Sequence, residues 1–116
     1  MDPLQMVPSI SPQALADRLS QGLDSLQLVD VRERGEAAIV SLPGFQLFPL
    51  SQYADWSSTI HTQLDPHKET IVLCHHGIRS AQMCQWLMAQ GFTQVKNLSG
   101  GIDAYAWEVD RTLPHY

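Results

Sequence analysis

The chain has 116 residues, of which 44% are hydrophobic and 16% charged, and its formal net charge is −5 at pH 7. This length and composition predict one packed domain over residues 1–116, with its core at roughly 9–114, and exclude a disordered tail. The acidic balance argues against a general nucleic-acid or anionic-membrane surface, so any anion site has to be local.

Capping residues and apolar runs place the elements of the first half of the chain. Ser11 before Pro12 is typical of a helix N-cap and a first helical position, and Gly22 is typical of a helix end. After this helix we expect, in chain order, a buried strand at 26–31, a short helical turn at 33–39, a second short strand at 45–48 and an amphipathic helix at 53–63. The spacing of Tyr53 and Trp56 in the last of these predicts that both aromatic rings pack in the core.

The second half of the chain repeats the alternation. Residues 70–73 form an apolar strand that leads into Cys74 and a short polar turn, and good helix formers run from Ala81 to Gly91. A strand at 94–97, a tight turn at 99–101 and a last helix at 102–109 follow. Alternating strands and helices predict an α/β fold with a mostly parallel central sheet flanked by helices on both faces, whose ligands bind at the carboxyl ends of the strands.

The segment after the central strand carries the chemistry. It reads Cys74-His75-His76-Gly77-Ile78-Arg79-Ser80 and opens onto a helix N-terminus, where unpaired N–H groups favour negative charge. A thiol at such a position ionises readily, and the thiolate is the reactive form. Gly77 permits a tight turn, so the interior amides of the six-residue loop can converge on the sulfur. We therefore expect Cys74 to be a nucleophile in an anion-binding loop.

The pattern Cys74-x-x-Gly77-x-Arg79-Ser80 resembles the active-site loop of the single-domain rhodanese (thiosulfate sulfurtransferase-like) family. The resemblance covers roughly residues 9–116. It extends to Leu28-Val29-Asp30-Val31-Arg32-Glu33, to Leu42-Pro43-Gly44 with Phe48-Pro49-Leu50, and to Asn97-Leu98-Ser99-Gly100-Gly101-Ile102. Family members commonly carry Gly-His before the Ile-Pro-Gly segment, where this chain has Val40-Ser41.

The resemblance implies a rhodanese-type sulfurtransferase, similar to thiosulfate:cyanide sulfurtransferases. The Cys74 thiolate would attack the outer sulfur of a small anionic donor such as thiosulfate, release sulfite and hold a persulfide. Cyanide, a thiol or a sulfur-accepting protein would then remove that sulfur. No cofactor is expected, because the cysteine carries the redox chemistry itself. The choice between thiosulfate and mercaptopyruvate as donor stays open.

Two other functions stay open beside this one. A cysteine-based phosphatase or an arsenate reductase uses the same thiolate and amides on a tetrahedral oxyanion. Those loops run Cys, five residues, Arg, whereas this loop runs Cys, four residues, Arg, and the narrower cradle favours a single sulfur atom. The other alternative is a catalytically silent rhodanese-fold binding module, against which the presence of Cys74 and Arg79 argues.

The expected substrate-binding loop consists of His75, His76, Gly77, Ile78 and Arg79. Either histidine can hydrogen-bond to an anionic substrate or attract it when protonated. We expect Arg79 to clamp the loop carbonyls while facing the anion, with a structural ion pair to Asp30 or Glu33 as the alternative. Asp30 and Arg32 are candidates for orienting the site from behind.

The remaining features concern metal binding, the second cysteine and the cellular location. Adjacent histidines in a turn point in different directions and no metal-ligand spacing accompanies them, so we expect no metal site. Cys84 shares an apolar helix face with Ala81, Leu87 and Met88, which favours a packing role over a resolving or redox role. Residues 1–6 lack signal-peptide features and no segment is long enough to span a bilayer, so we expect a cytoplasmic monomer that binds neither nucleic acid nor membrane.

Overall fold

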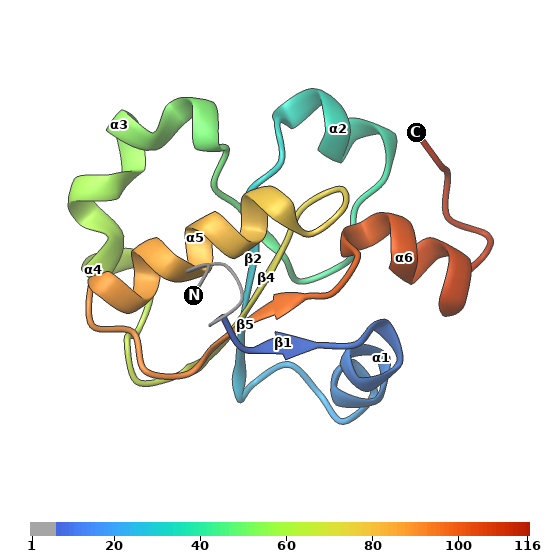
Figure 1. Cartoon of the computed structure of the whole chain (residues 1–116), viewed down its shortest axis with the longest axis horizontal. Helices are drawn as coiled ribbons and strands as arrows, with labels where there is room; N and C mark the ends of the chain where they lie inside the picture. Colours follow the sequence, from blue (N-terminus) through green and yellow to red (C-terminus); the bar gives the residue numbers. More distant parts are fainter. Residues whose placement is uncertain (1–6) are drawn as a thin grey trace.

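The computed structural model describes residues 7–116, so the expectation about residues 1–6 lies outside the described residues. The described chain forms an α/β fold (Figure 1). In chain order its elements are β1 (Ser9–Ile10), α1 (Pro12–Ser20), β2 (Leu26–Asp30), α2 (Arg34–Ile39), β3 (Gln46–Leu47), η2 (Leu50–Gln52), α3 (Tyr53–Trp56), η3 (Ser57–Thr59), α4 (Ile60–Gln63), β4 (Glu69–Leu73), α5 (Ile78–Ala89), β5 (Val95–Leu98) and α6 (Gly101–Glu108).

The five strands pair in the order β1-β5-β4-β2-β3, and every pairing among the described residues is parallel. This confirms the predicted parallel sheet. The chain runs from β2 outward to β3 and then crosses back to β4 and β5 on the other side, so β2 and β4 flank the point where the strand order reverses. Asp30 and Leu73 are paired at the carboxyl ends of these strands. Open parallel sheets bind ligands at such a point, directly outside the strand ends.

Both faces of the sheet are covered by helices, as predicted. Val72 points to one face, where it packs in a cluster with Leu87 and other side chains of α3, α4 and α5. Its neighbour Ile71 points to the opposite face and packs with Leu15 of α1 and Ile102 of α6. This alternation follows from the two-residue period of a strand. Successive residues of β4 therefore anchor two separate apolar clusters on either side of one sheet.

Helix α5 begins at Ile78, three residues earlier than the sequence predicts. Gly77 has a φ of 101°, a left-handed conformation that glycine adopts without the steric cost a side chain would add, and it turns the chain directly into the helix. The helix is therefore long enough to include Arg79 and Ser80 in its first turn. The start of α5 at Ile78 therefore determines where the Arg79 and Ser80 side chains lie, because it fixes both on a rigid element beside Cys74.

The prediction of one helix over 53–63 is wrong. The segment is divided into α3, the 3₁₀ segment η3 and α4. Thr59 Oγ1 donates to the Trp56 carbonyl at 3.3 Å, a local side-chain bond that competes with helical pairing. Trp56 and Ile60 are buried as predicted, but Tyr53 is 47% exposed, so its assignment to the core is also wrong.

The remaining differences are one additional strand and small shifts at the ends of other elements. β1 was not predicted, since a two-residue strand is too short to show a period; it pairs Ser9 with Asn97 and Ile10 with Leu98. β3 is shorter than predicted, and β5 is displaced by one residue from 94–97. None of the helices in residues 7–116 has the length and hydropathy needed to cross a bilayer.

Candidate active site

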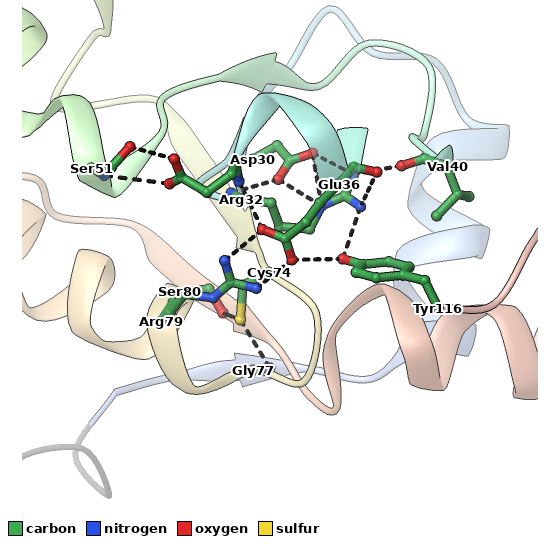
Figure 2. A network of polar contacts seen from close by, with 11 residues as sticks. Asp30, Arg32, Glu36, Val40, Ser51, Cys74, Gly77, Arg79, Ser80 and Tyr116 are labelled. Carbon is green, nitrogen blue, oxygen red and sulfur yellow. Dashed lines mark hydrogen bonds and ion pairs between the residues drawn. The ribbon is translucent and has the colours of Figure 1, made fainter. Parts of the chain in front are cut away.

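Cys74 follows β4, the middle strand of the sheet, and the residue is only 1% exposed. Its sulfur accepts hydrogen bonds from the Gly77 backbone N–H at 3.0 Å and from the Ser80 hydroxyl at 3.2 Å (Figure 2). We expected several loop amides to converge on the sulfur. Among the described residues, the Gly77 amide is the one backbone N–H bonded to Sγ, and a side-chain hydroxyl supplies the second donor.

Asn97 connects this hydroxyl to the loop. The Asn97 side-chain amide donates to the Gly77 carbonyl at 2.9 Å, which leaves its Oδ1 to accept from Ser80 Oγ. A hydroxyl has one proton, so Ser80 donates either to Asn97 or to Cys74 at a given moment. Rotation of this proton toward the sulfur stabilises the thiolate, while rotation toward Asn97 leaves Oγ free to accept from the neutral thiol. Ser80 and Asn97 belong to motifs noted in the sequence, but the sequence reasoning gave neither a role.

The loop carbonyls are held by the N-terminus of α6. Ile102 N–H donates to the Cys74 carbonyl at 2.9 Å, and Asp103 N–H donates to the His75 carbonyl at 3.1 Å. The first N–H groups of a helix have no partner within the helix, so they are free to bind these carbonyls. Gly101 makes the close approach possible, because any Cβ at this residue would overlap the backbone of Cys74 and His75. The prediction that Arg79 clamps the loop carbonyls is therefore wrong.

Arg79 instead forms a bidentate ion pair with Glu36 of α2 (Figure 2). Its Nη1 and Nη2 each lie 2.8 Å from a Glu36 carboxylate oxygen. The partner is neither Asp30 nor Glu33, the two acids that the sequence suggested. The Arg79 guanidinium lowers the pKa of Glu36 to about 2, and hydrogen bonding to Glu36 raises the pKa of Arg79. Glu36 is a site residue that the sequence reasoning missed.

Asp30 and Arg32 lie behind the site as a buried ion pair. Arg32 Nη2 is 2.7 Å from Asp30 Oδ2 and also donates to the Val40 carbonyl at 2.8 Å. Because this second acceptor is a backbone group, the departure from the family pattern at Val40-Ser41 leaves the contact intact. Arg32 Nη1 donates in turn to the Glu36 carbonyl at 3.4 Å and to the Tyr116 hydroxyl at 3.1 Å. The pair is thereby connected to the Glu36–Arg79 ion pair.

The prediction that the two loop histidines point in different directions is wrong. The ring centroids of His75 and His76 lie 3.9 Å apart, and His76 Nε2 is 3.8 Å from Asp103 Oδ2. Burial, followed by the neighbouring His76, lowers the pKa of His75, which favours the neutral ring. In the described part of the chain, His75, His76 and Asp103 each offer one ligand atom within 4.8 Å of the others. None of the three residues is buried, and we assign no metal to this group.

These groups surround a hollow of about 270 Å³ that is lined by Cys74, His75, His76, Ile78 and Arg79. The structure thus brings five of the residues predicted for the site to one hollow, while Gly77 turns the loop beneath it. Cys84 lies in the core with no exposed surface, and burial raises the pKa of its thiol to about 12. The predicted packing role of Cys84 is confirmed, although Met88 on the same helix is 41% exposed.

A thiol at the base of a hollow, after the middle strand of a parallel sheet, is the arrangement that the resemblance implied. The family model described as Rhodanese-like domain matches residues 11–108. The chain belongs to the rhodanese-like domain family. This rhodanese-like domain is 35% identical over 101 residues to a protein from Allochromatium vinosum named Sulfurtransferase, covering 87% of this chain and 90% of that one.

Two further comparisons extend this result. The chain is 50% identical over 94 residues to the Rhodanese-like/PpiC domain-containing protein 12, chloroplastic, of Arabidopsis thaliana, covering 81% of this chain but only 31% of the Arabidopsis protein. The crystal structure of a Rhodanese-like Domain Protein from Staphylococcus aureus superposes with a TM-score of 0.70 at 29% identity, covering 85% of this chain and 91% of that one. The rhodanese fold is therefore shown by both sequence and structure.

Proposed function

We propose that the protein is a sulfurtransferase that moves a sulfane sulfur from a small anionic donor such as thiosulfate to a thiophilic acceptor through a persulfide on Cys74. Relatives named sulfurtransferases support the general class of enzyme. The observation that carries the mechanism is the Cys74 sulfur at the base of the hollow, with the Gly77 N–H and the Ser80 hydroxyl aimed at it.

In the first half-reaction the Cys74 thiolate attacks the outer sulfur of thiosulfate. A bond forms between Sγ and that sulfur, the sulfur–sulfur bond of the donor breaks, and its electron pair leaves with sulfite. The negative charge then resides on the outer sulfur of the persulfide. The Gly77 N–H, in the tight turn, and the Ser80 hydroxyl, in the first turn of α5, are preorganised to stabilise the anionic Sγ of Cys74 before the attack.

In the second half-reaction an acceptor attacks the outer sulfur and Cys74 leaves as the thiolate. With cyanide the product is thiocyanate, and with a thiol the product is a new persulfide. The two steps exchange one sulfur atom and need no added oxidant or reductant, so we propose that no cofactor takes part. A cellular thiol or a sulfur-accepting protein is the acceptor we propose, and mercaptopyruvate is the donor to compare with thiosulfate.

Arg79 is the positively charged residue among those that line the hollow. Arg79 is half-buried at its rim, and its two terminal nitrogens are engaged by Glu36, so the guanidinium keeps its charge but is held in one orientation. The lowered pKa of His75 favours its neutral form. We propose that Arg79 supplies the positive charge that draws the donor toward Cys74, while Ile78, which is 66% exposed, forms an apolar part of the wall.

The cellular compartment and the oligomeric state are also matters of proposal. Two free thiols fit a reducing compartment, and we propose the cytoplasm; the Arabidopsis relative is chloroplastic by its name. We propose a monomer that requires neither nucleic acid nor membrane.

The test is to trap the sulfur adduct without an acceptor. Protein treated with thiosulfate alone and desalted should gain the mass of one sulfur atom, and cyanide should remove it as thiocyanate. Cleavage after Arg79 separates the peptide that contains Cys74 from the one that contains Cys84, and the added mass should map to Cys74. Cys74→Ser should abolish loading, while Cys84→Ala should retain most of it and lose about 1–2 kcal/mol of stability.

Each alternative function has its own outcome when the same protein is also assayed with mercaptopyruvate and with an aryl phosphate. Turnover without a trapped adduct would indicate direct transfer in a ternary complex. Hydrolysis of an aryl phosphate without thiocyanate formation would indicate a phosphatase. Inactivity with thiosulfate, mercaptopyruvate and the aryl phosphate would indicate a binding module.

A further inference from the structure

Residues 109–116 follow α6 and lie beyond residues 11–108, the range that the family model matches. A turn held by bonds from Thr112 N–H to Asp110 Oδ1 (3.1 Å) and from Leu113 N–H to the Asp110 carbonyl (3.3 Å) reverses the chain. The ring of His115 then stacks on Trp107 of α6, with centroids 4.2 Å apart. Figure 1 shows that this segment returns along α6 and reaches the neighbourhood of α2, the helix that carries Glu36.

Tyr116 thereby reaches the surroundings of the active site. Its hydroxyl accepts from Arg32 Nη1 at 3.1 Å and lies 3.0 Å from Glu36 Oε1 (Figure 2). An arginine cannot accept a hydrogen bond, so the single phenolic proton is free to be donated to the Glu36 carboxylate. The ring of Tyr116 also stacks on His75, with centroids 3.8 Å apart and an angle of 8° between the planes. One side chain thus contacts both the polar network and the loop that carries Cys74.

Glu36 depends on several donors for its orientation. One carboxylate oxygen, Oε2, accepts from Arg79 Nη1 and from the Glu33 backbone N–H, each at 2.8 Å. The other, Oε1, accepts from Arg79 Nη2 and from Tyr116. The Glu33 and Tyr116 donors hold the carboxylate so that both oxygens face the guanidinium of Arg79. If the Tyr116 hydroxyl is removed, Oε1 loses the donor that opposes rotation of the carboxylate away from Arg79.

We propose that Tyr116 is a positioning residue of sulfur transfer: its hydroxyl orients Glu36, which holds the Arg79 guanidinium at the rim of the hollow above Cys74. The inference deepens the proposed function and rests on it, because it assigns Arg79 to attraction of the anionic donor. Tyr116 does not touch the reacting sulfur. It acts through Glu36, and its stacking on His75 keeps the end of the chain in place.

The charge at the rim can be measured without any sulfur transfer. Iodoacetate is anionic and iodoacetamide is neutral, and both alkylate the Cys74 thiolate. The rate with iodoacetate divided by the rate with iodoacetamide therefore reports the positive charge that faces the hollow. In Tyr116→Phe, which keeps the stacked ring, this ratio should fall about threefold to fivefold, the effect of one hydrogen bond to a charged group weakened by solvent exposure. A mere loosening of the chain end would change both rates in the same proportion and leave the ratio unchanged.

Steady-state kinetics supply the second readout. Tyr116→Phe should raise the KM for thiosulfate by about the same factor and leave kcat within about twofold, since the attacking sulfur and its two donors are untouched. Tyr53→Phe is the matched control, because it deletes a phenolic hydroxyl from the aromatic cluster that Tyr53 forms with Trp56 and Trp86. This control should leave the alkylation ratio and the KM at the wild-type values.

A double-mutant cycle decides whether Tyr116 acts through Glu36. In a Glu36→Ala background, Tyr116→Phe should cause little further change in either readout, because the acceptor that its hydroxyl orients is already removed. Equal effects in both backgrounds, or an unchanged ratio in Tyr116→Phe, would overturn the proposal. If the ratio falls as expected but thiosulfate never loads Cys74 in the wild type, the positioning role stands and the proposed sulfur transfer fails.

Discussion

The backbone N–H of Ile102 donates to the carbonyl of Cys74 across 2.9 Å, so the start of α6 holds the residue that carries the nucleophile. The adjacent bond from Asp103 to His75 extends the same contact by one residue. Two segments that are distant in the sequence are therefore fixed backbone to backbone. This contact permits no side chain at Gly101, which has a φ of 65° and lies against both carbonyl groups.

Gly101→Ala should consequently impair both folding and activity. The new Cβ would lie 2.6 Å from the Cys74 carbonyl oxygen and would overlap the His75 carbonyl, so the loop or the helix must move. We expect a loss of about 3 kcal/mol in the free energy of unfolding, together with reduced alkylation of Cys74 by iodoacetamide. Urea unfolding and alkylation kinetics measure the two effects.

Gly22→Ala is the matched control for this variant. Gly22 also has a positive φ, of 104°, but an added Cβ would meet nothing within 4 Å. It should therefore cost only backbone strain, about 1–2 kcal/mol, and leave Cys74 reactivity unchanged. Equal losses of Cys74 reactivity in the two variants would show that the Gly101 contact does not position the loop.

Ser80→Ala removes the hydroxyl donor to the Cys74 sulfur and leaves Asn97 Oδ1 without this partner. Hydrogen bonds to charged groups are the stronger class, so sulfur transfer should fall about tenfold or more. Thr70→Val provides a control, because it also deletes a buried hydroxyl but lies at the opposite end of β4. Thr70→Val should lose stability while transferring sulfur at a rate near that of the wild type. A wild-type rate in Ser80→Ala would remove this hydroxyl from the mechanism.

The Glu36–Arg79 pair predicts a specific dependence of stability on pH. The pKa of Glu36 is about 2 in the folded protein, well below its usual 4.5, chiefly because Arg79 binds the carboxylate. A lowered pKa stabilises the fold above pH 4.5, and this contribution is lost as the pH falls toward 2. Between pH 6 and pH 3 the urea midpoint of the wild type should therefore fall further than that of Glu36→Gln. Glu108→Gln, at an exposed carboxylate of α6, should behave like the wild type; indistinguishable curves for all three proteins would contradict the prediction.

The parts of the site that could be predicted from the sequence are local. Cys74, Gly77 and Arg79 lie within one strand–loop–helix unit, where β-branched residues, a glycine and a helix start follow one another in a short stretch. The residues that organise this loop from outside lie far away in the chain. Glu36 is 43 residues from Arg79, and Tyr116 is 80 residues from Glu36, so no periodicity or spacing connects them.

The failed predictions share a physical cause. Arg79 was expected to bind the nearest carbonyls, but the first N–H groups of α6 already occupy the Cys74 and His75 carbonyls, so the guanidinium pairs with Glu36 instead. The hydrophobic pattern over 53–63 correctly predicted that Trp56 and Ile60 are buried. It could not show that the hydroxyl residues between them form a 3₁₀ segment that divides the helix. Tertiary competition for hydrogen bonds decides such cases, and it is invisible in a single sequence.

The length of the Cys74 loop makes a last prediction, since four residues separate Cys74 from Arg79. Inserting one glycine between Gly77 and Ile78 gives the five-residue spacing of the phosphatase-type loops. The insertion displaces α5 relative to Sγ, so the Ser80 donor is lost from the sulfur and the cradle widens. We expect thiocyanate formation to fall at least tenfold, with weak hydrolysis of an aryl phosphate as the activity gained. A glycine inserted after Gly22, in an exposed turn with open space, should leave sulfur transfer unchanged. Wild-type thiocyanate formation in the loop variant would refute the argument from cradle size, because the wider loop would then serve a single sulfur atom equally well.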